Sequence, residues 1–222
     1  MTIDYFSLGH PLATLRSHYA LRARRNMFDQ FMAFARPTCD NRVLDLGVTP
    51  DTSLPESNVF ERWYPYSSQL TAASIEYAKN IEKIFLGVHF VKLEPGMKLP
   101  FPDGYFHALH CSAVLEHVGD NDAQRQFIKE AVRVTRYFFF STPNRWFPID
   151  FHTFVPFAHW LPRKAHQTIL RGMKKDFWAK TENLNLLSRR QVFNLFPNCR
   201  TLQVKTISLF KIPSNILVFG EK

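Results

Sequence analysis

Four polar side chains stand where the sequence predicts strands of a sheet to end: Asp45, Glu76, Glu94 and Ser112. Their positions matter because an open α/β sheet binds its ligands at the carboxyl ends of the strands. A carboxylate such as that of Glu76 can hold the two hydroxyls of a ribose there. Gly47 follows the first strand, and its missing side chain lets the backbone approach a ligand closely. Together these residues predict a nucleoside-type ligand at this edge of the sheet.

The elements that must position these residues alternate between strands and helices. Short apolar runs predict strands at 42–47, 70–76, 88–93, 106–112, 137–142, 202–207 and 216–220. Apolar residues at helical spacing predict helices at 11–36, 77–85, 121–136 and 188–196, and 48–66 is expected to be a long loop. Asn121 with Gln124 has the pattern of a capping box, and Ala123, Phe127, Ala131 and Val134 form the expected buried face. This alternation indicates an α/β fold with a mostly parallel sheet.

Residues 143–187 interrupt the alternation and are rich in proline, tryptophan and histidine. We expect an inserted loop-and-helix element there, placed directly after the fifth strand. It begins with Asn144, Arg145 and Trp146, and polar groups beside aromatic rings are typical of a ligand pocket. The sequence therefore predicts that 143–187 forms a lid or wall of the substrate site.

Four segments in this order and spacing resemble a known family: VLDLGVTPD, TAASIE, LPFPDGYFHALHCSAVLEHVG and FFFSTPN. They are similar to the class I S-adenosylmethionine-dependent methyltransferases, in particular to the type 11 group that acts on small molecules. The resemblance covers about residues 25–145. NRWFPIDFHT, HWLPR and ENLNLLS also resemble a bacterial subgroup of these proteins. The resemblance implies a Rossmann-like, doubly wound sheet of seven strands, with residues 1–222 forming a single domain.

The resemblance also implies a cofactor, S-adenosylmethionine, whose product is S-adenosylhomocysteine. Asp45 and Gly47 match the residues that take its methionine part, and Glu76 matches the ribose-binding carboxylate. The remaining implied cofactor residues are Thr49, Glu94, Met97, Cys111 and Ser112. Two positions depart from the family pattern: the loop after Gly47 lacks its second and third glycines, and Pro95 stands where the family has an acidic residue. Thr49 offers a hydroxyl in this loop, which should be stiffer than a glycine-rich one.

Methyl transfer requires the acceptor to be held in line with the activated methyl group and shielded from water. A general base helps when the acceptor is a hydroxyl or an amine, and the candidates are His117, Asp150 and His152. Asn144, Arg145 and Trp146 are the candidate substrate-binding residues, with Arg145 suited to an acidic group. Two of these candidates have a structural alternative, which is a loop hydrogen bond for His117 and a salt bridge for Arg145.

We expect no metal ion. His107, His110, Cys111 and His117 lie around one strand, where alternate side chains point to opposite faces, so four ligands do not converge. His152, His159 and His166 recur every seven residues, which on a helix separates them by about 10 Å.

The net charge of +9 comes entirely from residues 112–222. Within them, 161–178 combines basic residues with an apolar stripe of Leu161, Ala165, Ile169 and Met173. This segment is expected either to pack its stripe on the sheet or to lie on an anionic membrane. Nucleic acid is a further candidate partner for the same charges, although nothing resembles an added RNA-binding module.

The sequence lacks a signal peptide and any apolar run near the roughly 20 residues of a membrane span. Three scattered cysteines fit a reducing compartment. These features predict a cytoplasmic protein, with peripheral contact to the inner face of a membrane as the alternative. The leading hypothesis is a methyltransferase for a small or lipid- or glycan-linked acceptor. The alternatives are a non-catalytic binding or scaffold protein with the same fold and, ranked lower, an RNA methyltransferase.

Overall fold

The computed structural model describes residues 13–96 and 98–222, and it contains one seven-stranded sheet with the order β3-β2-β1-β4-β5-β7-β6. The strands are β1 (Val43–Leu46), β2 (Leu70–Ser74), β3 (His89–Lys92), β4 (Phe106–Ser112), β5 (Thr135–Pro143), β6 (Thr201–Leu209) and β7 (Ile212–Glu221). The first five strands pair in parallel, and β7 runs antiparallel to both β5 and β6. The predicted seven-stranded, mostly parallel sheet is confirmed.

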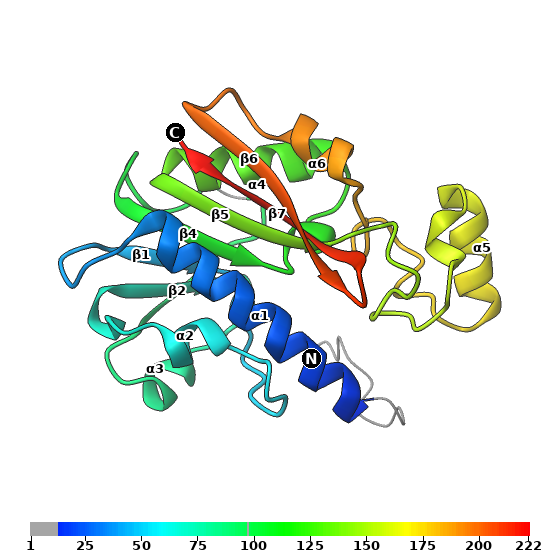
Figure 1. Cartoon of the computed structure of the whole chain (residues 1–222), viewed down its shortest axis with the longest axis horizontal. Helices are drawn as coiled ribbons and strands as arrows, with labels where there is room; N and C mark the ends of the chain where they lie inside the picture. Colours follow the sequence, from blue (N-terminus) through cyan, green and yellow to red (C-terminus); the bar gives the residue numbers. More distant parts are fainter. Residues whose placement is uncertain (1–12, 97) are drawn as a thin grey trace.

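Helices cover both faces of this sheet (Figure 1). They are α1 (Ala13–Ala35), α2 (Val59–Trp63), α3 (Ile81–Ile84), α4 (Asn121–Arg133), α5 (Arg163–Gly172) and α6 (Arg189–Leu195), with 3-10 turns η1 (Ser67–Gln69), η2 (Leu115–His117) and η3 (Ala158–Trp160). One buried cluster joins α1, α2 and α3 to the sheet, and a second joins α4 and α6 to the opposite face. The layers are therefore helix, sheet, helix, as a doubly wound fold requires.

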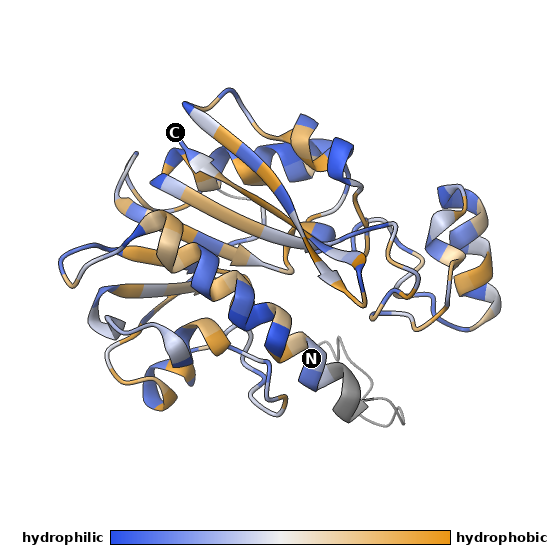
Figure 2. Cartoon of the chain, viewed as in Figure 1, coloured by the Kyte–Doolittle hydropathy of each residue, from blue (hydrophilic) through white to orange (hydrophobic). Residues whose placement is uncertain are grey.

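The run of phenylalanines in β5 shows why this strand is apolar on both sides. Phe139 packs with Phe31 of α1, whereas Phe138 and Phe140 pack with Phe196 just after α6. Successive side chains of a strand point to opposite faces, so a strand covered by helices on both faces needs apolar residues throughout. Figure 2 shows the same pattern as hydrophobic colour along the central strands.

The loop predicted at 48–66 and the helix predicted at 77–85 differ from the structure. The 48–66 loop contains the short helix α2, and the 77–85 helix is reduced to α3. The helix predicted at 11–36 runs over Ala13–Ala35, and its first two predicted residues lie outside the described part of the chain. It ends where Arg36 adopts a positive φ of 45° before Pro37. A proline disfavours helical backbone at the residue before it, which explains the stop.

The predicted cap of α4 is displaced by one residue. Asp120 is the N-cap, and its side chain accepts hydrogen bonds from the backbone N–H groups of Asp122 and Ala123. Gln124 is fully buried and donates to the Leu115 carbonyl instead of closing a capping box. Of the predicted buried face, Ala131 and Val134 are fully buried and Phe127 packs partly buried against the core, and Ile128 and Val132 are buried beside them. The carboxylate of Asp120 caps α4 directly, so the pattern at Asn121 is not used.

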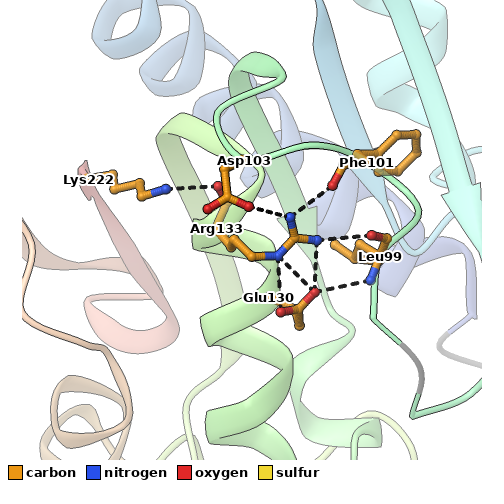
Figure 3. Close-up of polar contacts among 6 residues, drawn as sticks. All are labelled: Leu99, Phe101, Asp103, Glu130, Arg133 and Lys222. Carbon is orange, nitrogen blue, oxygen red and sulfur yellow. Dashed lines mark hydrogen bonds and ion pairs between the residues drawn. The ribbon is translucent and has the colours of Figure 1, made fainter.

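Arg133 at the end of α4 anchors the loop that precedes β4 (Figure 3). Its guanidinium donates to the Leu99 and Phe101 carbonyls, to Asp103 and to Glu130. Glu130 in turn accepts from the Leu99 N–H at 3.1 Å. Although burial opposes it, hydrogen bonding to Arg133 lowers the pKa of Glu130. This network fixes the LPFPD segment against α4.

The 143–187 insertion includes η3 and α5, and α5 stands apart from the sheet (Figure 1). A parallel bridge between Asn144 and Leu187 closes its base. The expected packing of the apolar stripe on the sheet is wrong: Leu161 and Met173 are 40% and 49% exposed, and Leu170 is the buried residue of α5. Within residues 13–96 and 98–222, no helix has both the length and the apolar character that a membrane span requires.

Candidate cofactor and acceptor site

A cavity of about 410 Å³ opens at the carboxyl ends of β1, β2 and β4. Ligand pockets are commonly 300–1,000 Å³, and this edge of an open α/β sheet is where they form. Five predicted cofactor residues line the cavity: Asp45, Gly47, Thr49, Glu76 and Ser112. The helices α1 and α2 close it from one side, and His117 and His152 line it as well.

Gly47 makes the sharp turn that opens this cavity. Its φ is +107°, and a Cβ at this position would collide with the Val114 side chain. Its N–H donates to the Ala73 carbonyl at 2.7 Å, which ties the end of β1 to β2. A side chain is therefore excluded here for two reasons, the backbone conformation and the space.

The loop after Gly47 is held by side chains in place of further glycines. Thr49 N–H donates to Asn58 Oδ1 at 3.2 Å, and Asn58 Nδ2 donates back to the Thr49 carbonyl at 2.8 Å. Asn58 itself adopts the left-handed conformation before α2. This reciprocal pair ties the loop to the start of α2.

Glu76 lies just beyond β2, with its carboxylate toward this loop. Thr49 Oγ1 lies 3.5 Å from Glu76 Oε2, and the Glu76 N–H donates to Ser74 Oγ. Burial raises the pKa of Glu76, and the contact with the Thr49 hydroxyl opposes that rise. Glu76 is thus a half-enclosed carboxylate at the cavity wall.

A buried group of charged residues forms the floor beneath Gly47. His110 Nδ1 lies 2.6 Å from Asp45 Oδ1, and the His110 ring stacks on Phe60 with centroids 4.2 Å apart. Burial raises the pKa of Asp45 to about 6 and lowers that of His110 to about 3. Burial and the adjacent Asp45 carboxylate raise the pKa of Glu61 well above its usual range. Burial thus disfavours the charged form of all three side chains, His110, Asp45 and Glu61.

Arg24 of α1 also lines the cavity and faces these acids. Burial lowers its pKa, while Glu56, Asp45, Glu116 and Glu61 all act to raise it. Sequence reasoning missed Arg24 and Glu61. The signals available were an arginine beside the apolar stripe of the first helix and a carboxylate in a segment taken for loop.

Three other predicted cofactor residues are placed differently. Glu94 is exposed and does not line the cavity, although Pro95 and Gly96 do. The Cys111 side chain is buried in the core on the α4 side, so only its backbone can serve the site. Met97 lies outside the described residues.

The three predicted catalytic residues lie together, but they do not have equal access to the cavity. His117 and His152 line it, with ring centroids 4.9 Å apart, and Trp178 packs 5.2 Å from His152. Asp150 is 4% exposed and does not line the cavity. Its carboxylate accepts from His152 Nδ1 at 2.7 Å and from the Thr153 hydroxyl. Asp150 is therefore placed to orient His152 and not to touch an acceptor.

The predicted substrate-binding residues lie outside the cavity lining. Asn144 donates to the Pro213 carbonyl and accepts from the Trp146 N–H, so it shapes the base of the insertion. Arg145 donates to the Leu161 carbonyl and lies over the Trp146 ring. Trp146 is 52% exposed and packs against Trp160. Asn144 and Arg145 are half-buried, and Trp146 and Trp160 are the exposed side chains beside them.

The sequence and the fold both match methyltransferases. Residues 65–137 match the family model described as a methyltransferase domain. No curated protein matches the sequence. Among solved structures, an S-adenosylmethionine-dependent methyltransferase from Methanosarcina mazei aligns with a TM-score of 0.51 and 13% identity, over 84% of this chain and 94% of its own. PigF bound to S-adenosylhomocysteine aligns with a TM-score of 0.54 and 15% identity, over 95% and 65%.

A putative zinc-dependent alcohol dehydrogenase from Rhodobacter sphaeroides shares the fold as well, with a TM-score of 0.59 and 12% identity over 89% of this chain and 90% of its own. At such identities a structural likeness shows the fold alone. The family match over 65–137 spans the Glu76 strand end and the LPFPD segment. Residues 65–137 therefore match a methyltransferase domain, and the described chain has the fold seen in solved S-adenosylmethionine-dependent methyltransferases.

Proposed function

We propose that this protein transfers the methyl group of S-adenosylmethionine to a small or lipid-linked acceptor. One observation carries the proposal: a single cavity is lined both by the strand-end residues that suit the cofactor and by two histidines that suit an acceptor. In this proposal residues 1–222 act as one domain, and 143–187 supplies the acceptor side through His152 and Trp178.

The cofactor part of the cavity has donors and acceptors of the right kind. Glu76 would accept hydrogen bonds from the two ribose hydroxyls, and the bare backbone at Gly47 would lie against the methionine part. Asp45 would face the positive charges of the ligand, and Arg24 its carboxylate, because opposite charges in a partly buried site attract strongly. The backbone near Cys111 and Ser112 is available at the end of β4.

When bound, S-adenosylmethionine supplies an already activated methyl group. The chain then has to orient the acceptor, exclude water and accept a proton. Burial lowers the pKa of His117, so its ring is neutral at physiological pH and can accept a proton. Although burial opposes it, the Asp150 carboxylate raises the pKa of His152. The two rings thus differ in basicity while facing the same cavity.

Affinity measurements test the cofactor assignment. Glu76→Ala should weaken S-adenosylmethionine binding by roughly 1.5–3 kcal/mol, about 10- to 150-fold, which is the range for hydrogen bonds to a charged group. Glu94→Ala serves as the matched control, because Glu94 is exposed and outside the cavity lining. Calorimetry with the folded variants gives the result. Unchanged affinity in Glu76→Ala would place the ribose elsewhere, and no binding by the wild type at millimolar cofactor would remove the proposal.

Measurements of methyl transfer distinguish a methyltransferase from a non-catalytic scaffold protein with the same fold. His152→Ala should impair methyl transfer and leave cofactor affinity within about threefold, since a group that meets only the acceptor acts on that substrate alone. Labelled cofactor incubated with lipid, small-molecule and RNA fractions of an extract reports the acceptor class. Tight cofactor binding without methyl transfer to any fraction supports the non-catalytic binding or scaffold protein. Label found in the RNA fraction alone supports an RNA methyltransferase.

A lipid-linked acceptor is favoured by the exposed apolar surface of the insertion. Its large exposed side chains are Trp146, Phe157, Trp160, Leu161, Met173 and Phe177, and Arg163, Lys164, Arg171, Lys174 and Lys175 lie in the same segment. Aromatic residues beside basic ones suit the interface of an anionic membrane. Trp160→Ser with Phe177→Ser should reduce sedimentation with phosphatidylglycerol vesicles, while Phe193→Ser, which removes an exposed ring on α6, should not. Equal sedimentation of all forms would rule out this surface.

A further inference from the structure

Glu116, His117 and His152 form a compact group at the acceptor end of the cavity. Each offers one ligand atom, and these atoms all lie within 4.8 Å of one another. Glu116 and His117 belong to η2, just after β4, and His152 comes from the insertion after β5. Three ligands placed about 2.1 Å from one ion lie roughly 3–4 Å apart, so small side-chain movements would close the site.

Glu116 carries the strongest signal in this group. It is fully buried, and its Oε2 accepts a hydrogen bond from the Thr142 hydroxyl at 2.9 Å. Its Oε1 is buried and has no hydrogen-bond partner within the described residues. His117 Nε2 lies 4.0 Å from Glu116 Oε1, which is beyond hydrogen-bond distance. A buried carboxylate oxygen left without a partner is costly, and a bound cation would compensate it.

Both histidines are oriented through their other ring nitrogen. His117 Nδ1 lies 2.7 Å from the Asn183 carbonyl, which can only accept, so Nδ1 carries the proton. His152 Nδ1 donates to Asp150 Oδ1 at 2.7 Å. In each neutral ring this places the lone pair on Nε2. A metal-binding histidine typically donates its second N–H to a carboxylate or a carbonyl in this way.

We propose that Glu116, His117 and His152 bind a divalent transition-metal ion, with Zn²⁺ as the reference ion. Two imidazoles and one carboxylate favour zinc or a neighbouring transition metal over Mg²⁺ or Ca²⁺, which prefer oxygen ligands. Both histidines line the cavity, so the remaining coordination positions face the space assigned to the acceptor. Asp150, Thr142 and the Asn183 carbonyl are the positioning groups. The proposal concerns metal binding and does not require methyl transfer; with the ion bound, the Nε2 lone pairs of His117 and His152 are ligands, so neither ring then accepts a proton.

The sequence analysis predicts no metal site because it compares only candidate ligands that are close together in the chain. His117 and His152 were considered in separate sets, and Glu116 in neither. The contact depends on the return of the insertion to η2, through Asn185, whose N–H donates to the Glu116 carbonyl at 2.7 Å. A contact between residues that far apart in the chain is not visible in local spacing.

The test uses the full chain, stripped with a chelator and then titrated with Co²⁺ and Zn²⁺. We expect one equivalent of Co²⁺ to give visible absorption bands, and Zn²⁺ to displace it. Hyperfine-shifted N–H proton signals from two imidazoles should appear in the Co²⁺ form, one for each histidine. This wild-type readout does not depend on whether any variant folds.

Variants assign the ligands. Glu116→Gln and His152→Ala should abolish stoichiometric Co²⁺ binding, and Asp150→Asn should weaken it by about 10- to 100-fold, the range for a group that orients a ligand. His89→Ala is the control, because the His89 side chain is 72% exposed and lies on β3. The proposal would be overturned if the wild type bound no metal at micromolar concentration. It would also be overturned if folded Glu116→Gln and His152→Ala bound Co²⁺ as tightly as the wild type. Cofactor calorimetry on the same samples reports separately on the proposed function.

Discussion

His110 and Asp45 share a hydrogen bond of 2.6 Å that joins β4 to the end of β1 directly beneath the cavity. Both side chains are buried, and their pKa values move in opposite directions because burial disfavours each charged form. The neutral His110 ring can donate its Nδ1 proton to Asp45 once that carboxyl is ionised. The charge presented to the cavity floor therefore changes with the protonation of Asp45.

The affinity for S-adenosylmethionine should rise with pH through about 6. Burial raises the pKa of Asp45 to about 6, so its negative charge is present above that pH and lost as the pH falls below it. S-adenosylmethionine carries a net positive charge that S-adenosylhomocysteine lacks, so its binding should fall by up to about tenfold for each pH unit below 6. Calorimetry between pH 5 and 8 measures this. Asp45→Asn should flatten the profile, and an equally steep profile in that variant would assign the titration to another group.

Gly47→Ala should destabilise the protein and nearly abolish cofactor binding. The substitution forces a side chain into a backbone with φ of +107° and against Val114, and strain of this kind costs about 1–3 kcal/mol. Gly172→Ala is the control, since a Cβ there meets nothing within 4 Å in α5 and should be neutral or stabilising. Denaturant unfolding of both variants makes the comparison. Wild-type stability in Gly47→Ala would show that the turn can relax.

The sequence predicted the sheet well because its strands are continuous apolar runs that end in glycine, serine or a carboxylate. Phe138 to Phe140 can be apolar in succession only in a strand covered on both faces, and that is where β5 lies. The same pattern also predicted the site residues that lie at the ends of the strands. Asp45, Gly47, Glu76 and Ser112 meet because parallel strands end at one edge.

The parts that sequence reasoning missed depend on contacts between distant segments. Glu61 lies in α2, a five-residue helix whose burial against His110 and Asp45 no local period reveals. Trp146 was expected in a pocket because it follows β5, yet the chain turns at Asn144 and carries it to the exposed side. Short helices and insertions are set by tertiary packing, which overrides local propensity.

Arg133→Leu should loosen the loop before β4. Arg133 donates hydrogen bonds to two loop carbonyls and pairs with Glu130, and its removal leaves Glu130 partly buried without its partner. We expect a loss of about 1–2 kcal/mol in the free energy of unfolding, allowing for the solvent exposure of the pair. Asp103→Ala removes the most exposed partner and should change stability little. Chemical denaturation checks both, and a loss in Asp103→Ala as large as that in Arg133→Leu would contradict the assignment.

Arg24→Met should weaken the binding of S-adenosylmethionine and S-adenosylhomocysteine by similar factors. Arg24 lines the cavity, and both ligands carry the same amino-acid carboxylate, so the loss of a charge-assisted contact should cost each roughly 1.5–3 kcal/mol. This pattern differs from that of Asp45, whose charge should matter more for the cationic ligand.

Arg22→Met is the matched control, because Arg22 lies on the same helix and is exposed. Arg24→Lys keeps the positive charge among the surrounding acids and should retain an intermediate affinity. Calorimetry measures the affinity of each variant for both ligands. If folded Arg24→Met binds both ligands as tightly as Arg22→Met does, the cofactor carboxylate lies elsewhere in the cavity. Arg24 would then serve only to balance the charges of Asp45, Glu56 and Glu61.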